Sequence, residues 1–303
     1  PMSHAAPLAP IGAVPFSDGA GHGPAEKIAF QGTRAIIARG AFANVHNRLY
    51  AIDAADRAAP FAASMREFAG VVGGVRLQGE VALACTSAAG VEPPTLWSLD
   101  AADPTAGLPT ISALQTPALV NFEIDGHALH AIGADGSLYT FNIADPAAMV
   151  LASTLPGVLP AGAEPIDIEI ANGRAYILDR ASRLATLDLA APFSPQPVAL
   201  VQLIQIAGNI YATDIEVTGD TLYFTASRGF EPRLMAFDIA DPSAPVPLAS
   251  RLIPPFVDYP LALTPTGVLV GAGVLLHFDF ITCPCPADLN LDGQVDMADL
   301  MLA

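Results

Sequence analysis

Lysine, cysteine and long apolar runs are all scarce in this chain of 303 residues. Lys27 is the only lysine, and 13 basic residues stand against 30 acidic ones, which gives a net charge of −17. A surface this acidic repels phosphate backbones, so nucleic acid is not expected as a partner. No uncharged apolar run reaches the roughly 18 residues that a membrane helix needs, so we expect no membrane span.

Cysteine usage offers little support for a metal site or a disulfide framework. Cys85 lies in the apolar segment VALAC and is predicted to be a buried small hydrophobe. Cys283 and Cys285 are separated by one proline, too close to bridge each other readily, and a single pair is a poor zinc site. The chain begins PMSHAAP, which fits either a removed signal peptide or a cytosolic protein.

What the chain does have is an internal repeat. LYAIDAAD (49–56), LYTFNIADP (138–146) and LMAFDIADP (234–242) are three of its copies, each an apolar strand that ends in Asp or Asn before a turn. Each copy follows a second motif of strand, glycine-containing turn and strand. The second motif begins at residues 27, 74, 121, 167, 214 and 262. A step this regular indicates six related units.

A unit of this size with four short strands is typical of a propeller blade. The last unit lacks the segment that follows the Asp-Pro turn elsewhere, but PLAPIGAVPF (7–16) matches PLASRLIPPF (247–256). We therefore predict an all-β fold for residues 1–281. It is a six-bladed β-propeller whose last blade is completed by residues 7–16 as an N-terminal strand.

The repeats resemble those of the LVIVD-repeat propellers of bacterial surface and secreted proteins. The similarity lies in DIEIANGRAYIL (167–178) and LMAFDIADPSAPV (234–246) and extends faintly over all six copies. The resemblance implies a propeller fold and an extracellular or cell-surface location. It implies little chemistry, because functions in that group are poorly defined.

A possible metal site lies near the end of the sequence, in DLNLDGQVDMAD (288–299). Gly293 falls where an EF-hand loop turns sharply, and oxygen-bearing residues alternate around it, as Ca²⁺ requires. The predicted Ca²⁺ ligands are Asp288, Asn290, Asp292, Gln294 through its carbonyl, Asp296 and Asp299. The plainer alternative is a solvated turn rich in Asp and Asn.

This loop ends in Asp rather than Glu, and CPCPA before it excludes an entering helix. Both features resemble a dockerin repeat, in which the loop is followed by one helix, here MADLMLA. The resemblance assigns residues 282–303 to a partial dockerin-like module with a short helix. It implies a cohesin-like or cell-surface protein partner contacted through Met297 and Ala298. Dockerins carry two such repeats, and only one is present here.

The first strand of each predicted blade places two rings of residues along a central channel. The first ring is Lys27, Gly74, Asn121, Asp167, Asp214 and Ala262. The second ring, two residues further on the same face, is Ala29, Arg76, Glu123, Glu169, Glu216 and Thr264. Asn121, Glu123, Asp167, Glu169, Asp214 and Glu216 could bind a cation, a cationic ligand or the hydroxyl groups of a carbohydrate. The carboxylates could also supply the acid and nucleophile of a glycosidase. Alternatively, the ring Asp residues accept backbone hydrogen bonds between blades.

The remaining chemistry-bearing residues form no recognisable site. His127 and His130 lie three apart on a strand, on opposite faces, and are expected to be satisfied core or surface residues. Trp97 is expected to pack between blades. The sequence favours a secreted binding or scaffold propeller attached through a Ca²⁺-dependent tail. The alternatives are a polysaccharide-degrading hydrolase or lyase, and a purely structural spacer.

Overall fold

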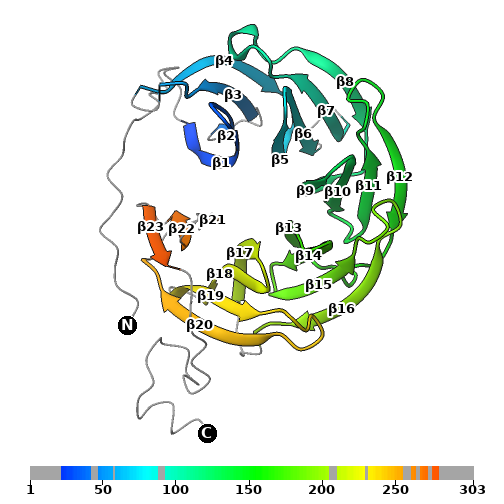
Figure 1. The fold of residues 1–303 in the computed structure, drawn as a ribbon, viewed down its shortest axis with the longest axis vertical. Coiled ribbons are helices and arrows are strands. Elements are labelled where there is room, and N and C mark those ends of the chain that lie inside the picture. Colours follow the sequence, from blue (N-terminus) through cyan, green and yellow to red (C-terminus); the bar gives the residue numbers. More distant parts are fainter. Residues whose placement is uncertain are drawn as a thin grey trace, which may run out of the picture. The chain divides into compact units, whose positions relative to one another are not determined.

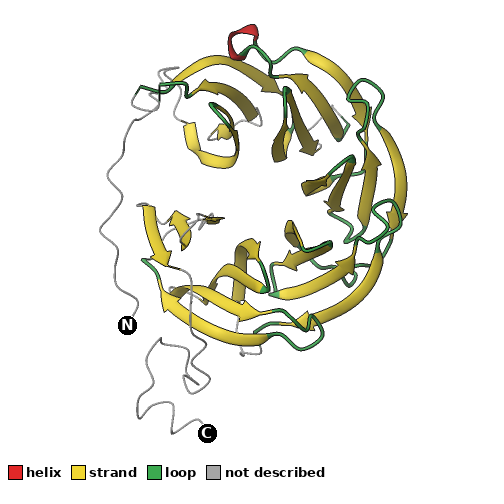
Figure 2. Ribbon diagram, viewed as in Figure 1, coloured by secondary structure: helices red, strands yellow, loops and turns green. Residues whose placement is uncertain are grey.

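The computed structural model describes residues 22–41, 47–56, 59–87, 93–204, 210–228, 231–254, 261–263, 267–271 and 275–279. They fall into two compact units, an N-terminal unit within Pro10–Gly157 and a C-terminal unit within Val158–Ala303. Among these residues the structure is almost entirely β, with one short 3-10 element, η1 (Pro104–Ala106) (Figure 2).

The N-terminal unit holds three four-stranded antiparallel sheets, each a meander in which consecutive strands pair. We call them blade 1 (β1–β4), blade 2 (β5–β8) and blade 3 (β9–β12) (Figure 1). The strands are β1 (His22–Gln31), β2 (Arg34–Ala41), β3 (Asn47–Asp53), β4 (Phe61–Phe68), β5 (Val71–Gln78), β6 (Val81–Ser87), β7 (Thr95–Asp100), β8 (Thr110–Gln115), β9 (Leu119–Asp125), β10 (Ala128–Gly133), β11 (Leu138–Asn142) and β12 (Val150–Leu155).

The C-terminal unit holds blade 4 (β13–β16), blade 5 (β17–β20) and a final sheet of three strands, β21–β23. The strands are β13 (Pro165–Ala171), β14 (Arg174–Asp179), β15 (Arg183–Asp188), β16 (Gln196–Gln202), β17 (Ile210–Thr218), β18 (Thr221–Arg228), β19 (Glu231–Asp238), β20 (Val246–Leu252), β21 (Leu261–Leu263), β22 (Gly267–Gly271) and β23 (Leu275–Asp279).

The prediction of six blades is therefore wrong. The described residues form five complete four-stranded blades, because the final sheet has only three strands. The physical reason lies in the sixth repeat, where ITCPCP replaces the outer-strand segment and proline cannot donate a ladder hydrogen bond. The predicted terminal helix, MADLMLA (297–303), lies outside the described residues, and the described residues themselves contain no α-helix.

Several predictions fall on residues that the structure does not describe. These are the closing strand at 7–16, the partial dockerin-like module at 282–303 with its Ca²⁺ loop, and Thr264. The predicted unit starts that are described lie on the first strand of each sheet: Lys27 on β1, Gly74 on β5, Asn121 on β9, Asp167 on β13, Asp214 on β17 and Ala262 on β21.

The turns within each repeat follow from local chemistry. Between β13 and β14, Asn172 and Gly173 both have positive φ, 52° and 71°, as a two-residue turn between twisted strands requires. After the third strand of blade 5, the Oδ1 of Asp238 accepts a hydrogen bond from Ala240 N at 2.9 Å. The same Asp or Asn turn follows the third strand of every complete blade and sets the direction of the outer strand.

Within each unit, neighbouring sheets pack face to face through apolar side chains. The first strands lie next to one another, β1 with β5 and β5 with β9, and likewise β13 with β17 and β17 with β21. Leu83 and Leu96 of blade 2 pack against Leu129 and Phe141 of blade 3. This burial is the main source of stability, since a single sheet cannot cover both of its apolar faces.

Trp97 and Cys85 behave as the sequence predicts. The Trp97 ring packs edge-on against Phe68 of blade 1 at 5.4 Å between centroids, and its Nε1 donates to Thr86 Oγ1 at 3.1 Å. Cys85 is buried, and this burial raises the pKa of its thiol to about 11. Such a thiol is an inert core group.

Candidate functional site

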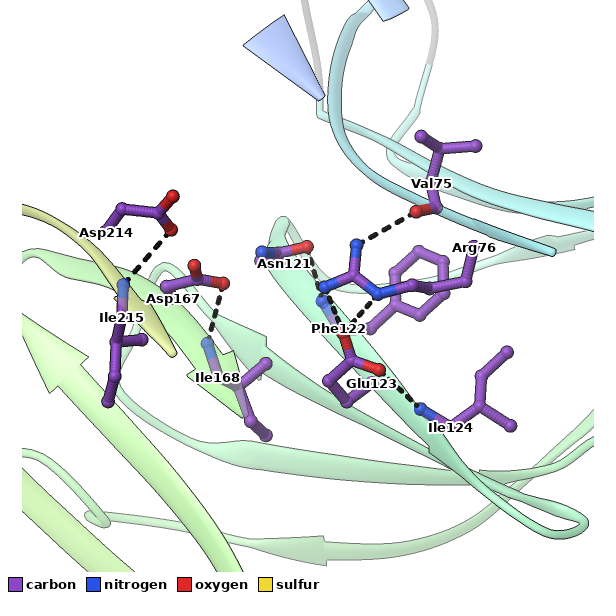
Figure 3. A network of polar contacts seen from close by, with 10 residues as sticks. All are labelled: Val75, Arg76, Asn121, Phe122, Glu123, Ile124, Asp167, Ile168, Asp214 and Ile215. Atoms are coloured by element: carbon purple, nitrogen blue, oxygen red, sulfur yellow. Dashed lines mark hydrogen bonds and ion pairs between the residues drawn. The ribbon is translucent and has the colours of Figure 1, made fainter. Parts of the chain in front are cut away.

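The first ring position is occupied by a close packing contact in the N-terminal unit. Asn121 is buried, and its Oδ1 accepts a hydrogen bond from Phe122 N at 2.9 Å (Figure 3). A Cβ built on Gly74 of blade 2 would overlap this oxygen. The glycine in the ring therefore leaves room for the asparagine of the next blade, one repeat along the chain.

In the C-terminal unit the same position holds carboxylates that accept backbone hydrogen bonds. Asp167 is buried, and its Oδ1 accepts from Ile168 N at 2.9 Å. Asp214 accepts from Ile215 N at 3.1 Å through Oδ1 and from Leu261 N at 2.6 Å through Oδ2. Leu261 begins the next sheet, 47 residues along the chain. Asp214 therefore ties blade 5 to the final sheet, as the structural alternative from the sequence predicts.

The second ring position contains an ion pair between blades 2 and 3. Nε and Nη2 of Arg76 lie against Glu123 Oε1, one repeat of 47 residues away (Figure 3). Arg76 Nη1 also donates to Val75 O at 2.9 Å, and its guanidinium lies 6.0 Å from the centre of the Phe122 ring. Glu123 Oε2 accepts from Ile124 N at 3.3 Å. Glu123 is thus neutralised by a fixed cation.

Glu169 and Glu216 occupy the equivalent positions in blades 4 and 5, and both are partly exposed. Glu169 lies directly opposite Tyr176 on the neighbouring strand, and Glu216 lies opposite Tyr223. Both tyrosines are buried. The two carboxylates therefore lie at matching register beside buried tyrosines, and both are partly exposed to solvent.

Blade 3 has a histidine where blades 4 and 5 have these tyrosines. His130 lies opposite Glu123 in the sheet and is 0% exposed. Its Nδ1 lies 3.1 Å from Thr140 Oγ1, while its Nε2 has no hydrogen-bond partner among the described residues. Burial lowers the pKa of His130 to about 4, against a smaller opposing effect of the Asp125 charge. His130 is therefore a neutral core residue near neutral pH.

This special position of His130 was not predicted from the sequence, although the repeat contains a sign of it. His130 follows Glu123 by the same interval that separates Tyr176 from Glu169 and Tyr223 from Glu216. Aligning the copies on their second strands would have placed the three residues together. The predicted role of His130 as a core residue is confirmed. The prediction that both ring nitrogens have hydrogen-bond partners is not confirmed among the described residues.

The described residues show no group of three or more His, Cys, Asp or Glu side chains placed to hold a metal ion. The predicted Ca²⁺ ligands at 288–299 lie outside the described part of the chain, so the structure does not bear on them. Nor is there, in the part that the structure describes, a helix long and apolar enough to pass through a lipid bilayer.

Comparisons with known proteins point to one fold. No family model matches the sequence, and no curated protein matches it. The periplasmic gluconolactonase PpgL of Pseudomonas aeruginosa superposes with a TM-score of 0.65 at 14% identity, over 82% of this chain and 78% of that one. BamB of Moraxella catarrhalis gives 0.55 at 13% identity, over 93% and 98%.

The β-propeller domain of Cps50 (Swd1) of Myceliophteria thermophila gives a TM-score of 0.61 at 12% identity, over 84% of this chain and 82% of that one. Identities this low establish architecture and leave activity open. Together with the repeated four-stranded sheets, the likeness shows that this chain has the β-propeller fold.

Proposed function

We propose that the chain is a binding or scaffold module built on a β-propeller rather than an enzyme. The proposal is carried by Asp214, whose carboxylate accepts hydrogen bonds from two backbone N–H groups, one of them in the next sheet. A carboxylate held this way joins two neighbouring sheets, which supports a structural role for this ring position. Arg76 neutralises Glu123 in a similar manner. Both contacts support a structural use of the ring positions.

The proposed ligand surface comprises the polar ring residues of blades 3 to 5, centred on Glu169 and Glu216. Their partial exposure above buried tyrosines supports a site for the hydroxyl groups of a carbohydrate or for a cationic group. Asn121, Glu123, Asp167 and Asp214 would contribute mainly by fixing the strands. We expect saturable binding of oligosaccharides without cleavage.

The test is calorimetric titration of the purified chain with a panel of neutral and acidic oligosaccharides, with product analysis of the same mixtures. Binding without turnover, weakened by Glu169→Gln together with Glu216→Gln, is the expected result. Turnover abolished by the same substitutions would instead support the alternative, a polysaccharide-degrading hydrolase or lyase. Because PpgL is named a gluconolactonase, a gluconolactone belongs in the panel.

A second part of the proposal rests on sequence alone. We propose that residues 288–299 bind Ca²⁺ and attach the propeller to a cohesin-like or cell-surface protein outside the cell. The alternating oxygen ligands around Gly293 support this assignment. Titration with Ca²⁺ should show binding that Asp292→Asn weakens by about tenfold or more. Equal Ca²⁺ affinity in the variant would contradict the Ca²⁺ site. Retention of the protein inside the native cells would contradict its extracellular location.

A further inference from the structure

The outer strand of each blade is a sheet edge. β4, β8 and β12 in the N-terminal unit each pair with one described strand only, as do β16 and β20 in the C-terminal unit. An edge strand presents backbone N–H and C=O groups that can pair with another polypeptide. Proteins usually protect such edges with charged residues, proline or bulges, so an edge with little protection is informative.

Of the two edges with neither a charged residue nor proline, β8 and β12, β12 has the more exposed large apolar side chains. Its sequence, VLASTL, contains no charged residue and no proline, and Val150 and Leu151 are 52% and 47% exposed. One register shift opposite Thr140 and Phe141 is its only irregularity among the paired residues. The strand therefore offers apolar side chains and backbone hydrogen-bonding groups together.

β4 of the same unit shows what a protected edge looks like. It also exposes apolar side chains, Phe61 at 50% and Met65 at 41%, but it carries Arg66 and Glu67. Arg66 donates from Nη1 to Leu108 O at 2.7 Å and from Nη2 to Thr110 Oγ1 at 2.6 Å in blade 2. The charges on β4 discourage strand addition, and β12 has none.

We propose that the outer edge of β12 binds an extended segment of another protein by strand addition. This inference rests on the proposed function as a binding module and names its partner. The segment carries β-forming side chains that cover Val150 on one face of the sheet edge and Leu151 on the other. It carries Lys or Arg at the end beside Asp145, the only charged residue between positions 142 and 157. Asp145 is exposed in the turn before β12.

Electrostatics favours a basic segment of another protein over a second copy of this chain at the β12 edge. Two copies would each bring a net charge of −17 to the same contact, and their repulsion opposes association. A segment with a basic end is attracted by the net negative charge of this chain and can form an ion pair with Asp145. Both effects favour its binding. Main-chain hydrogen bonds along the edge then supply affinity, as in other strand-addition complexes.

The experiment uses a fluorescently labelled, end-capped peptide of alternating Val and Thr that ends in a pair of Lys, with fluorescence anisotropy as the readout. The test variant is Val150→Lys with Thr154→Lys, which places charge along the edge at exposed positions. The control variant is Phe61→Lys with Met65→Lys, which makes the same charge change on the exposed face of β4. We expect the test variant to bind the peptide about tenfold or more weakly than the control does.

Three outcomes would overturn the inference. The first is no binding to the unaltered chain, and the second is an equal loss in the two variants. The third is a dimer of the unaltered chain, seen by light scattering, that the β12 variant alone abolishes, because the edge would then belong to a second copy. Equal binding of a matched peptide ending in a pair of Glu would overturn the assignment of a basic partner. Oligosaccharide binding at Glu169 and Glu216 is measured separately, so failure at the edge leaves the proposed function standing.

Discussion

The N-terminal and C-terminal units join each blade to the next through different side chains at the ring positions. In the N-terminal unit, Gly74 makes room for Asn121, and Arg76 pairs with Glu123. In the C-terminal unit, Asp214 reaches across to the backbone of Leu261. The repeat therefore conserves the geometry of its first strands while the chemistry at each position varies. A polar residue at a ring position is consequently weak evidence for catalysis.

The largest effect is expected where the N-terminal unit depends on close backbone approach. A Cβ on Gly73 would overlap the carbonyl oxygen of Val120 in blade 3, and backbone cannot move aside as a side chain can. Gly73→Ala should lower the free energy of unfolding by about 3 kcal/mol, measured by urea denaturation.

Gly79 is the matched control for this substitution. It has a φ of 62°, and no atom lies within 4 Å of a built Cβ. Gly79→Ala should therefore cost only the strain of a left-handed residue, about 1 kcal/mol. Equal losses for the two alanines would show that blades 2 and 3 do not approach as closely as described.

A second prediction concerns the histidine that distinguishes blade 3. The pKa of His130 is about 4 in the folded chain, below the ordinary value of 6.5. The unfolded chain therefore binds more protons between these two pH values, so stability falls as pH decreases from 6.5 towards 4. The loss attributable to His130 should approach roughly 3 kcal/mol near pH 4.

The measurement is the free energy of unfolding as a function of pH for the unaltered chain and for His130→Gln. Carboxylates titrate in the lower part of the same range, so the difference between the two curves isolates the histidine. A difference that stays constant from pH 7 to pH 4 would contradict the buried, neutral state of His130.

A smaller loss is expected at the carboxylate that joins the C-terminal unit. Asp214→Ala removes the acceptor for Ile215 N and Leu261 N and should cost about 2 kcal/mol in urea denaturation. Asp214→Asn keeps an acceptor oxygen and should recover part of that loss. If asparagine is no better than alanine, the hydrogen bonds are not what makes Asp214 stabilising.

The smallest effect belongs to the ion pair of the N-terminal unit. Arg76 and Glu123 are both partly exposed, so water and salt weaken their attraction. A double-mutant cycle with Arg76→Met and Glu123→Gln should give a coupling energy of about 1 kcal/mol that decreases at high salt. A coupling energy of zero at low salt would show that the ion pair does not help to join blades 2 and 3.

The repeat made the strands and their faces predictable from sequence. Apolar alternation and glycine turns placed the first strands of the blades, and the recurrence of Asp167 and Asp214 suggested backbone hydrogen bonds. Such features are local or periodic, so one sequence suffices to see them. The ion pair of Arg76 with Glu123 could also have been predicted, because the two opposite charges lie one repeat apart in the sequence.

Other features depended on contacts that periodicity does not encode. The blade count was overestimated because a sequence match between 7–16 and 247–256 shows similarity without showing where the strand lies. The core position of His130 was predicted, yet the lack of a partner for its Nε2 among the described residues depends on which side chains surround it in three dimensions. The sequence assigned Gly74 to the first ring without a reason for a glycine there. Only the structure shows that Asn121 occupies the space that a side chain at this position would fill.

Amide hydrogen exchange at Leu261 directly measures whether polar ring residues hold adjacent sheets together. We expect slow exchange of the Leu261 N–H in the unaltered chain, because it donates a hydrogen bond to Asp214 Oδ2 at 2.6 Å. Asp214→Ala should make this exchange fast while Leu234 in β19 stays protected. Rapid exchange at Leu261 in the unaltered chain, or unchanged protection in the variant, would contradict this role of Asp214.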